Sequence, residues 1–223
     1  IEKAPSIRAL VPDPIKGGSS SLLWGGEAGI LDEAFSDWLG ITIERANGGT
    51  SWRMLEGIWP GRNLADPTKD TRTRCGEHQA AIYKGQYWKD MSTCTQFNIT
   101  DDWCYRHCNT GVPNKMFYLL SVGTQNEDGG KFNNTVVQPL GIETAMDIAY
   151  KANTKYWKKN DLTFVDAMNG MVDAAAGFYG GLDSNAAYQV KNAWAAVGVT
   201  DKPRITTDVS PNVLLWVGGT TSG

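Results

Sequence analysis

Two carboxylates four residues apart are the first candidates for chemistry in this sequence. Glu33 and Asp37 fall in a segment whose apolar residues recur every three or four positions, so a helix would project both side chains from one face. Two neighbouring acids destabilise a helix unless they share a positive charge. A solvated helix face is the ordinary interpretation. A functional interpretation needs a nearby cation or arginine, with one carboxylate binding it and the other orienting a neighbour.

Histidine is scarce enough to limit the chemistry. The chain holds 2 histidines in 223 residues, His78 and His107. His78 stands beside Glu77 and close to Cys75, and we expect a loop or surface residue there. Taken alone, His107 would be interpreted as a capping or core histidine.

The four cysteines suggest a stapled loop region. They fall within 34 residues, with 18, 9 and 3 residues between them: Cys75, Cys94, Cys104 and Cys108. A structural zinc site is the alternative, but these spacings lack paired Cys-x-x-Cys knuckles. Two N-glycosylation acceptors, Asn98 and Asn133, lie in or just after this stretch. We therefore predict a secreted glycoprotein with two disulfides, whose pairing the sequence leaves open among three connectivities.

Charge and hydropathy exclude two classes of partner. Lys plus Arg number 21 and Asp plus Glu 24, a net charge of -3, which argues against nucleic acid. No apolar run approaches the roughly 18 residues that span a bilayer, so no membrane span is expected. No basic and then apolar segment opens the chain, so any targeting peptide is expected to be gone already.

The elements that position these residues are mainly helical. Apolar periodicity predicts one helix over 28–39 with Gly40 as its stop, and a bundle of four helices after Asn109. These four cover 112–120 with Asn109 or Thr110 as cap, 141–157, 162–178 closing at Gly180-Gly181, and 184–197 capped by Ser184. Residues 45–108 should be long loops clamped by disulfides. We expect an irregular N-terminal arm (1–21), a helical lobe (22–199) and a tail (200–223) with one possible strand, Val213 to Val217.

Four stretches, in order, resemble the thermolysin-like zinc metallopeptidases. The run from Glu27 to Gly40, EAGILDEAFSDWLG, closely resembles the helix that carries the third zinc ligand of that family. The other matches are Arg62-Asn63-Leu64-Ala65-Asp66-Pro67, Asp102 with the segments 107–114 and 117–120, and the stretch from Gly141-Ile142 through Tyr179-Gly180 to 196–199. The resemblance covers about residues 22–199 and implies the C-terminal helical lobe of this fold.

The resemblance also implies roles for individual residues. Glu33 would be the zinc-ligating carboxylate and Asp37 its outer-shell partner. His107, held by Asp102, would stabilise the oxyanion of the tetrahedral intermediate, and Arg62 would bind the peptide carbonyl. Peptide hydrolysis independently favours such a set, because it needs a polarised carbonyl and a donor where negative charge develops.

The chain departs from that family at the metal sites. The other two zinc ligands and the general base of the family lie in a His-Glu-x-x-His helix about twenty residues before the third ligand, yet residues 7–21 hold no histidine. With His107 assigned elsewhere, the sequence cannot assemble three catalytic zinc ligands. Trp24 stands where the family usually has a tyrosine.

A calcium site of the family also looks eroded. Glu44 and Glu56 match its acids, but Ser51 and Arg53 replace two others. A guanidinium opposes a cation, so calcium is doubtful.

Two functions from different classes follow. The first is a secreted pseudo-peptidase, a catalytically incomplete binding or assembly module in an extracellular complex, with no cofactor of its own. The second is half of an active zinc metalloendopeptidase, whose His-Glu-x-x-His helix comes from a separate or removed N-terminal chain. A lobe that normally packs on another domain should leave apolar surface exposed, so both predict a protein partner or self-association.

Overall fold

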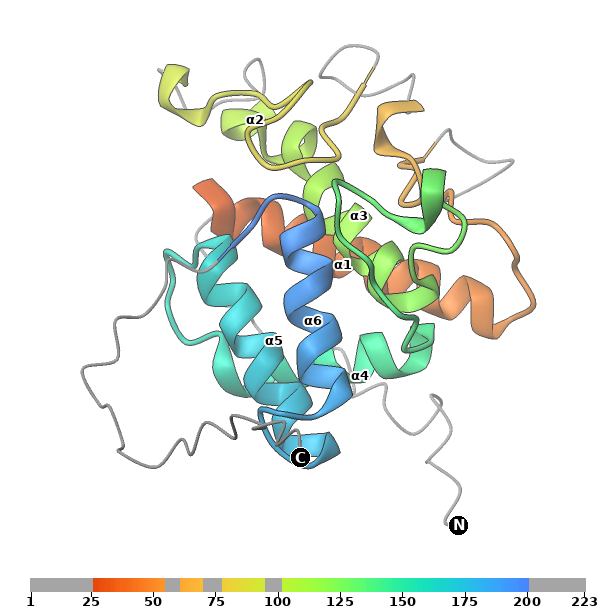
Figure 1. Ribbon diagram of the computed structural model, residues 1–223. Helices are drawn as coiled ribbons and strands as arrows, with labels where there is room; N and C mark the ends of the chain where they lie inside the picture. The colour runs from red at the N-terminus through yellow and green to blue at the C-terminus, as the bar shows by residue number, and fades with distance from the viewer. Residues whose placement is uncertain (1–25, 55–60, 70–77, 95–101, 201–223) are drawn as a thin grey trace, which may run out of the picture.

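The chain folds into a mainly helical lobe, as the sequence predicts. A computed structural model describes residues 26–54, 61–69, 78–94 and 102–200 (Figure 1). Within those ranges the only pairings of β type are two isolated bridges, Arg53 with Asn63 and Phe132 with Thr135. The helices are α1 (Gly26–Ala46), α2 (Asp102–Asn109), α3 (Gly111–Val122), α4 (Ile142–Lys151), α5 (Phe164–Tyr179) and α6 (Asn185–Ala196). Short turns η2 (Pro67–Lys69), η3 (Met91–Thr93), η4 (Asp128–Gly130) and η5 (Ala152–Tyr156) connect them.

The helices divide into a bundle and a cap of loops. In Figure 1, α5 and α6 lie side by side, and α1 crosses behind the upper part of α6. Helix α1 contacts α2, α3, α4 and α5 and is therefore the central helix of the lobe. The segment 78–94 and α2 gather at the opposite end from the α5–α6 connection. This end carries the candidate residues.

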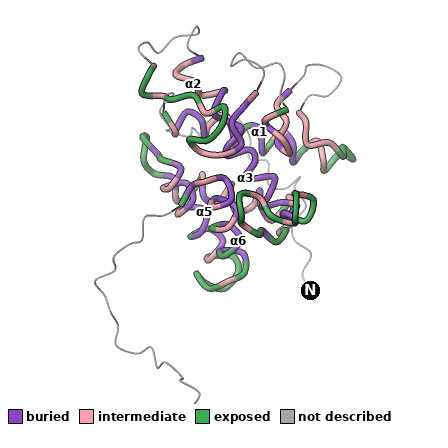
Figure 2. Tube along the Cα trace, turned by 45° about the horizontal axis from the view of Figure 1, so that its top comes forward, coloured by how far each residue is buried: buried purple, intermediate pink, exposed green. Residues whose placement is uncertain are grey.

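The core is built from the apolar stripes of these helices. Figure 2 shows buried positions running along α1, α3, α5 and α6. The indole ring of Trp38 in α1 stacks on the ring of Phe117 in α3, with centroids 5.1 Å apart and planes 8° from parallel. Phe164 and Trp194 bring α5 and α6 together at 5.8 Å. Each large side chain buried in this way contributes roughly 1.5–3 kcal/mol, which holds α1 rigidly against the bundle.

Two predicted helix boundaries are confirmed. Helix α5 ends at Gly180, whose φ of 93° is left-handed, as expected for a glycine C-cap. Helix α6 begins after Ser184, whose hydroxyl accepts a hydrogen bond from the backbone N–H of Ala187 at 3.3 Å. Both signals are local, so the sequence carries them without tertiary information.

One other boundary prediction, the stop at Gly40, is wrong, and two hold only in part. Helix α1 does not stop at Gly40 but continues to Ala46, because the buried Ile41 and Thr42 favour another turn more than one glycine opposes it. The helix predicted over 141–157 is α-helical only as far as Lys151 and continues as the π-helical turn η5. No side-chain hydrogen bond from Thr110 caps α3, and the buried side chain of Asn109 instead bonds the backbone of Lys89.

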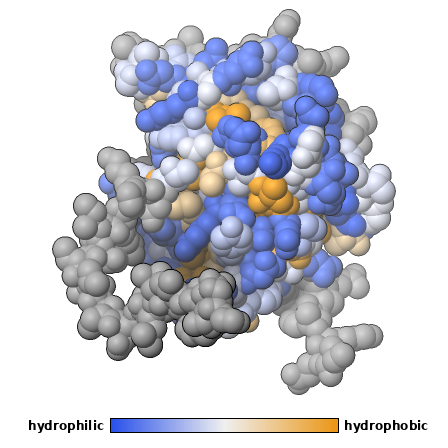
Figure 3. All heavy atoms as spheres, in the orientation of Figure 1, coloured by the Kyte–Doolittle hydropathy of each residue, from blue (hydrophilic) through white to orange (hydrophobic). Residues whose placement is uncertain are grey.

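The remaining predictions about organisation concern the surface and the two ends. No helix within the described ranges is long and apolar enough to cross a bilayer. The face in Figure 3 is largely hydrophilic, with small separate apolar spots. The N-terminal arm, Trp24 and the possible strand Val213 to Val217 all lie outside the described residues.

Candidate functional site

Helix α1 carries the two carboxylates one turn apart, at the end of the lobe where α2 packs against it. The side chain of Glu33 is 19% exposed and that of Asp37 is 2% exposed. A solvated helix face, the ordinary interpretation of such a pair, is therefore wrong for both residues. Each carboxylate instead meets cations supplied by segments distant in the sequence.

Asp37 anchors an arginine from the loop before η2. The Nε and Nη2 atoms of Arg62 donate to the two oxygens of Asp37, which makes a bidentate ion pair. The side chain of Asn114 in α3 donates to Oδ2 of the same carboxylate at 2.8 Å. Asp37 thus satisfies three donors inside the protein. It fixes Arg62 beside Glu33, with Nη2 3.7 Å from Glu33 Oε2.

Glu33 is enclosed by positive charge. Arg106 Nη2 lies 3.0 Å from its Oε1, and His107 Nε2 lies 3.1 Å from its Oε2. Burial acts to raise the pKa of Glu33, but the hydrogen bond from His107 and the charges of His107, Arg106 and Arg62 outweigh it. The resulting pKa lies below the ordinary value. Glu33 is therefore an ionised carboxylate among three cationic groups.

His107 bridges two carboxylates. Its Nδ1 lies 2.7 Å from Oδ1 of Asp102, and its Nε2 faces Glu33. The hydrogen bonds to Asp102 and then to Glu33 raise the pKa of His107 from 6.5 to about 9, against the opposing effect of burial. At neutral pH the imidazole is protonated and donates from both nitrogens, which would also suit a developing oxyanion.

Asp102 lies at the start of an unusual turn. Its carboxylate Oδ2 accepts the backbone N–H groups of His107 at 2.9 Å and of Cys108 at 3.1 Å. Asp102, Trp103, Cys104 and Tyr105 have φ values of 52°, 52°, 61° and 63°. These left-handed conformations cost roughly 1–2 kcal/mol per L-residue. The regular part of α2 therefore begins only after Tyr105, at the residue before His107.

The cysteine predictions are confirmed where the structure describes them. Cys94 and Cys104 form a disulfide with Cα atoms 5.3 Å apart, which excludes a four-cysteine zinc site. Cys108 is also disulfide-bonded, while Cys75 lies outside the described residues. Asn98 lies outside them as well. Asn133 is exposed in a tight turn with a φ of 47°, and its glycosylation stays a prediction.

The described residues do not fit a zinc ion. Within the described ranges, no group of three His, Cys, Asp or Glu residues is placed to hold a metal. Glu33 already has cationic neighbours, and a protonated His107 has no lone pair for a metal. The metal role of Glu33 and the outer-shell role of Asp37 accordingly stay predictions that depend on ligands from elsewhere.

The predicted erosion of the calcium site has a partial structural counterpart. Arg53 Nη1 donates to the carbonyl oxygen of Gly61 at 3.1 Å, and Ser51 Oγ accepts the Arg53 backbone N–H at 2.9 Å. Glu44 is described, but Glu56 is not. The guanidinium in this loop agrees with the doubt about calcium. The absence of calcium itself stays a prediction.

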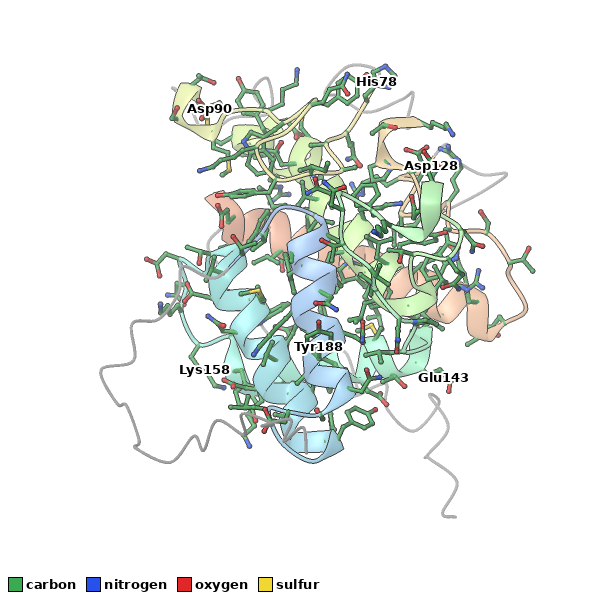
Figure 4. The ribbon with its side chains drawn as sticks, in the orientation of Figure 1. His78, Asp90, Asp128, Glu143, Lys158 and Tyr188 are labelled. Atoms are coloured by element: carbon green, nitrogen blue, oxygen red, sulfur yellow. A yellow bond between two sulfur atoms is a disulfide. The ribbon has the colours of Figure 1, made fainter. Side chains whose placement is uncertain are left out.

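Sequence reasoning missed two members of this cluster, Arg106 and Asn114. Arg106 directly precedes His107, and the left-handed turn before it brings both side chains to Glu33. No periodicity rule predicts that geometry. His78, by contrast, lies in a loop at the upper edge of Figure 4, where its ring packs 4.5 Å from that of Tyr87. It is a loop histidine, as predicted, and takes no part in the cluster.

A pocket of about 510 Å³ lies nearby but includes none of these residues. Its wall holds Lys115, whose Nζ lies 2.6 Å from Glu127 Oε1 and over the rings of Tyr118 and Phe132 at 4.8 and 4.5 Å. Burial lowers the pKa of this amine, while Glu127 acts to raise it. The lysine also donates to the carbonyl oxygen of Ala65 at 2.7 Å, so protein groups already satisfy it.

Comparison with known proteins identifies the family to which this lobe belongs. Residues 20–199 match the alpha-helical domain of the thermolysin metallopeptidase family. The chain belongs to this family. It is 33% identical over 189 residues to a bacillolysin of Bacillus cereus, covering 81% of this chain and 29% of that protein. It is 30% identical over 191 residues to a zinc metalloproteinase of Renibacterium salmoninarum, covering 81% of this chain and 32% of that protein.

A solved structure supports the same fold. The precursor of protealysin from Serratia proteamaculans superposes with a TM-score of 0.55 at 22% identity, covering 80% of this chain and 52% of that one. The chain spans less than a third of the length of each of the two curated relatives named above. Membership of the thermolysin family establishes the helical lobe, and the activity of whole family members remains a matter for proposal.

Proposed function

We propose that this chain is a secreted pseudo-peptidase, a thermolysin-like helical lobe that serves as a binding or assembly module in an extracellular complex. One observation carries the proposal: Arg106, His107 and Arg62 surround the Glu33 carboxylate at 3.0, 3.1 and 3.7 Å. The carboxylate that would bind the metal in this family is already neutralised by its own chain.

Electrostatics gives the size of the effect. Two unit charges 4 Å apart interact by about 4 kcal/mol at the effective dielectric constant of a partly buried site, and a dication doubles this value. A metal bound to Glu33 would lie within a few ångströms of Arg106, because one carboxylate would face both. The guanidinium therefore disfavours zinc at this position by several kcal/mol unless it moves away.

Two features support the secreted and assembly parts of the proposal. The Cys94–Cys104 disulfide and the exposed acceptor Asn133 suit an oxidising compartment. Large apolar side chains also reach the surface, among them Leu39 and Ile43 one turn apart on α1, with exposed fractions of 39% and 40%. Such a pair suits a protein partner or a second copy of the chain.

The test is metal analysis of the purified natural material together with intact-mass identification of every chain present. The proposal predicts less than a tenth of a zinc atom per chain and no hydrolysis of an unstructured protein substrate. A matched Arg106→Val variant should bind zinc more tightly than the wild type in a titration with zinc alone. Stoichiometric zinc in the natural material, with a second chain that bears His-Glu-x-x-His, would contradict the proposal.

A second candidate is half of an active metalloendopeptidase, with its missing helix supplied by another chain. Its specific support is that His107 with Asp102 at 2.7 Å and Arg62 beside Glu33 converge as the family resemblance implies. In that case a protonated His107 would donate to the oxyanion, and Arg62 would orient the peptide carbonyl. Activity of the natural material that His107→Ala abolishes and Asp102→Asn lowers, with unchanged chain composition, would favour this candidate.

A further inference from the structure

The turn that carries Asp102 requires an outside constraint. Asp102, Trp103, Cys104 and Tyr105 all have φ values between 52° and 63°. Glycine adopts this region freely, but tryptophan, cysteine and tyrosine avoid it, because the Cβ atom approaches the following carbonyl oxygen. Runs of such residues persist only where surrounding structure enforces them. The sequence of the turn would relax to ordinary backbone conformations if nothing held it.

One constraint on the turn is a disulfide to a separately anchored loop. Cys104, the third residue of the turn, is bonded to Cys94, ten residues earlier. Cys94 ends the turn η3, and its N–H donates to the carbonyl of Met91 at 3.2 Å. The other end of this loop is held by the buried side chain of Asn109, which donates to Lys89 O at 2.8 Å and accepts from Lys89 N at 2.9 Å. The disulfide therefore fastens the turn to a loop that has its own attachment to α2.

What the turn holds in place is the partner of His107. Three of the hydrogen bonds to the Asp102 carboxylate come from the His107 ring at 2.7 Å and from the backbone N–H groups of His107 and Cys108 at 2.9 and 3.1 Å. All three depend on where the turn places the Asp102 backbone. The disulfide, the left-handed turn and the orientation of the His107 ring thus form one structural unit.

We propose that the Cys94–Cys104 disulfide is a redox-sensitive clamp on the Asp102–Tyr105 turn, which keeps the Asp102 carboxylate against His107 and releases it on reduction. The reductant is a dithiol, either a small molecule or a protein with a vicinal pair. Its two thiols become a disulfide and give up two electrons and two protons. The Cys94–Cys104 bond breaks, and each sulfur becomes a thiol. The clamp holds whether the lobe binds peptides or cuts them.

Exposure makes the Cys94–Cys104 disulfide accessible to a thiol. Cys94 and Cys104 are both partly exposed, whereas the disulfide-bonded Cys108 is 2% exposed. Asp90, on the same loop as Cys94, is labelled at the outer edge of the molecule in Figure 4. Thiol exchange requires an attacking thiolate to reach one sulfur along the bond axis. A small dithiol should therefore be able to reach the Cys94–Cys104 bond.

The first test is amide hydrogen exchange on the full chain before and after mild reduction with a small dithiol, with alkylation and mass mapping to confirm which bond opened. The amides of His107 and Cys108, both bonded to Asp102, should exchange at least tenfold faster, while those of α3 stay unchanged. The Cys94→Ala/Cys104→Ala variant should behave in the same way. Unchanged protection of the two amides with the bond open would overturn the proposal.

A glycine rescue separates the clamp from simple tethering. In the Cys94→Ala/Cys104→Ala background, Trp103→Gly with Tyr105→Gly should restore part of the protection of His107 and Cys108, because glycine adopts left-handed φ values without the steric cost that a Cβ atom adds. The matched control, Trp103→Ala with Tyr105→Ala, removes the same rings but keeps the Cβ atoms and should not restore it. Equal behaviour of the glycine and alanine pairs would overturn the proposal. If the cysteine variants do not fold, the reduced wild type decides the question alone.

Discussion

Replacing Asp37 by alanine should destabilise the lobe more than any other single change in the charged cluster. The residue is 1% exposed, and it accepts a bidentate ion pair from Arg62 and a hydrogen bond from Asn114. Removing one partner of a buried ion pair costs about 3–5 kcal/mol, because the other charge is left uncompensated. For a chain of this length, 1 kcal/mol shifts the melting temperature by about 2–4 °C, so Asp37→Ala should lower it by about 6–20 °C.

Denaturant unfolding of Asp37→Ala, Arg62→Ala and the double variant measures the coupling directly. The double variant should be more stable than the sum of the two single losses predicts, by about 2 kcal/mol or more, because it removes both charges together. Asp173→Ala, which deletes an exposed acid on α5, serves as the control and should stay within about 0.5 kcal/mol of the wild type. A loss below about 1 kcal/mol for Asp37→Ala, or a coupling near zero, would refute the assignment of Asp37 as a buried anchor.

Three further outcomes are expected. Because the pKa of His107 is raised to about 9, the stability that its protonation contributes should be complete below about pH 6.5 and should be lost as the pH rises through 9; unfolding curves should show this loss, and His107→Gln should not. Gly170→Ala should destabilise α5 by about 1–3 kcal/mol, since the new Cβ would lie 2.7 Å from the Trp157 ring, whereas Gly177→Ala, whose nearest atom is 3.6 Å away, should stabilise it by about 0.5–1 kcal/mol; equal thermal shifts would contradict this reasoning. Chain made in a eukaryotic secretory host should lose mass on glycosidase treatment, and Asn133→Gln should remove that part of the shift.

Much of the fold was predictable because its signals are local. Apolar positions at three- and four-residue spacing located the helices, and Ser184 and Gly180 marked two ends by chemistry that acts within one turn. The failure at Gly40 has the opposite cause. A glycine is a weak stop when the next turn buries Ile41 completely, and burial depends on α3 and the loops, which local sequence does not show.

The site residues also divide into those that the sequence predicts and those that it does not. The spacing of Glu33 and Asp37 placed both on one face of a helix and called for a shared positive charge, and the family resemblance then pointed to Arg62. Arg106 was missed because the direction of its side chain follows from the left-handed turn before it. That turn contains no glycine, so the sequence gives no signal of left-handed backbone there. Neither periodicity nor composition could therefore predict that Arg106 lies beside Glu33.

Charge balance is what separates the two candidate functions. Glu33, Asp37 and Asp102 supply three negative charges, and Arg62, Arg106 and a protonated His107 supply three positive ones, so the cluster is neutral when the described residues alone form it. A dication could join only if the guanidinium of Arg106 withdrew or His107 gave up a proton, and each change would undo contacts that now fix Glu33. Half of an active enzyme would need a partner chain whose own metal ligands compensate for the lost ion pairs. A binding module needs no such partner, because its ion pairs are already complete, and the Arg106→Val zinc titration measures how far this one side chain sets the difference.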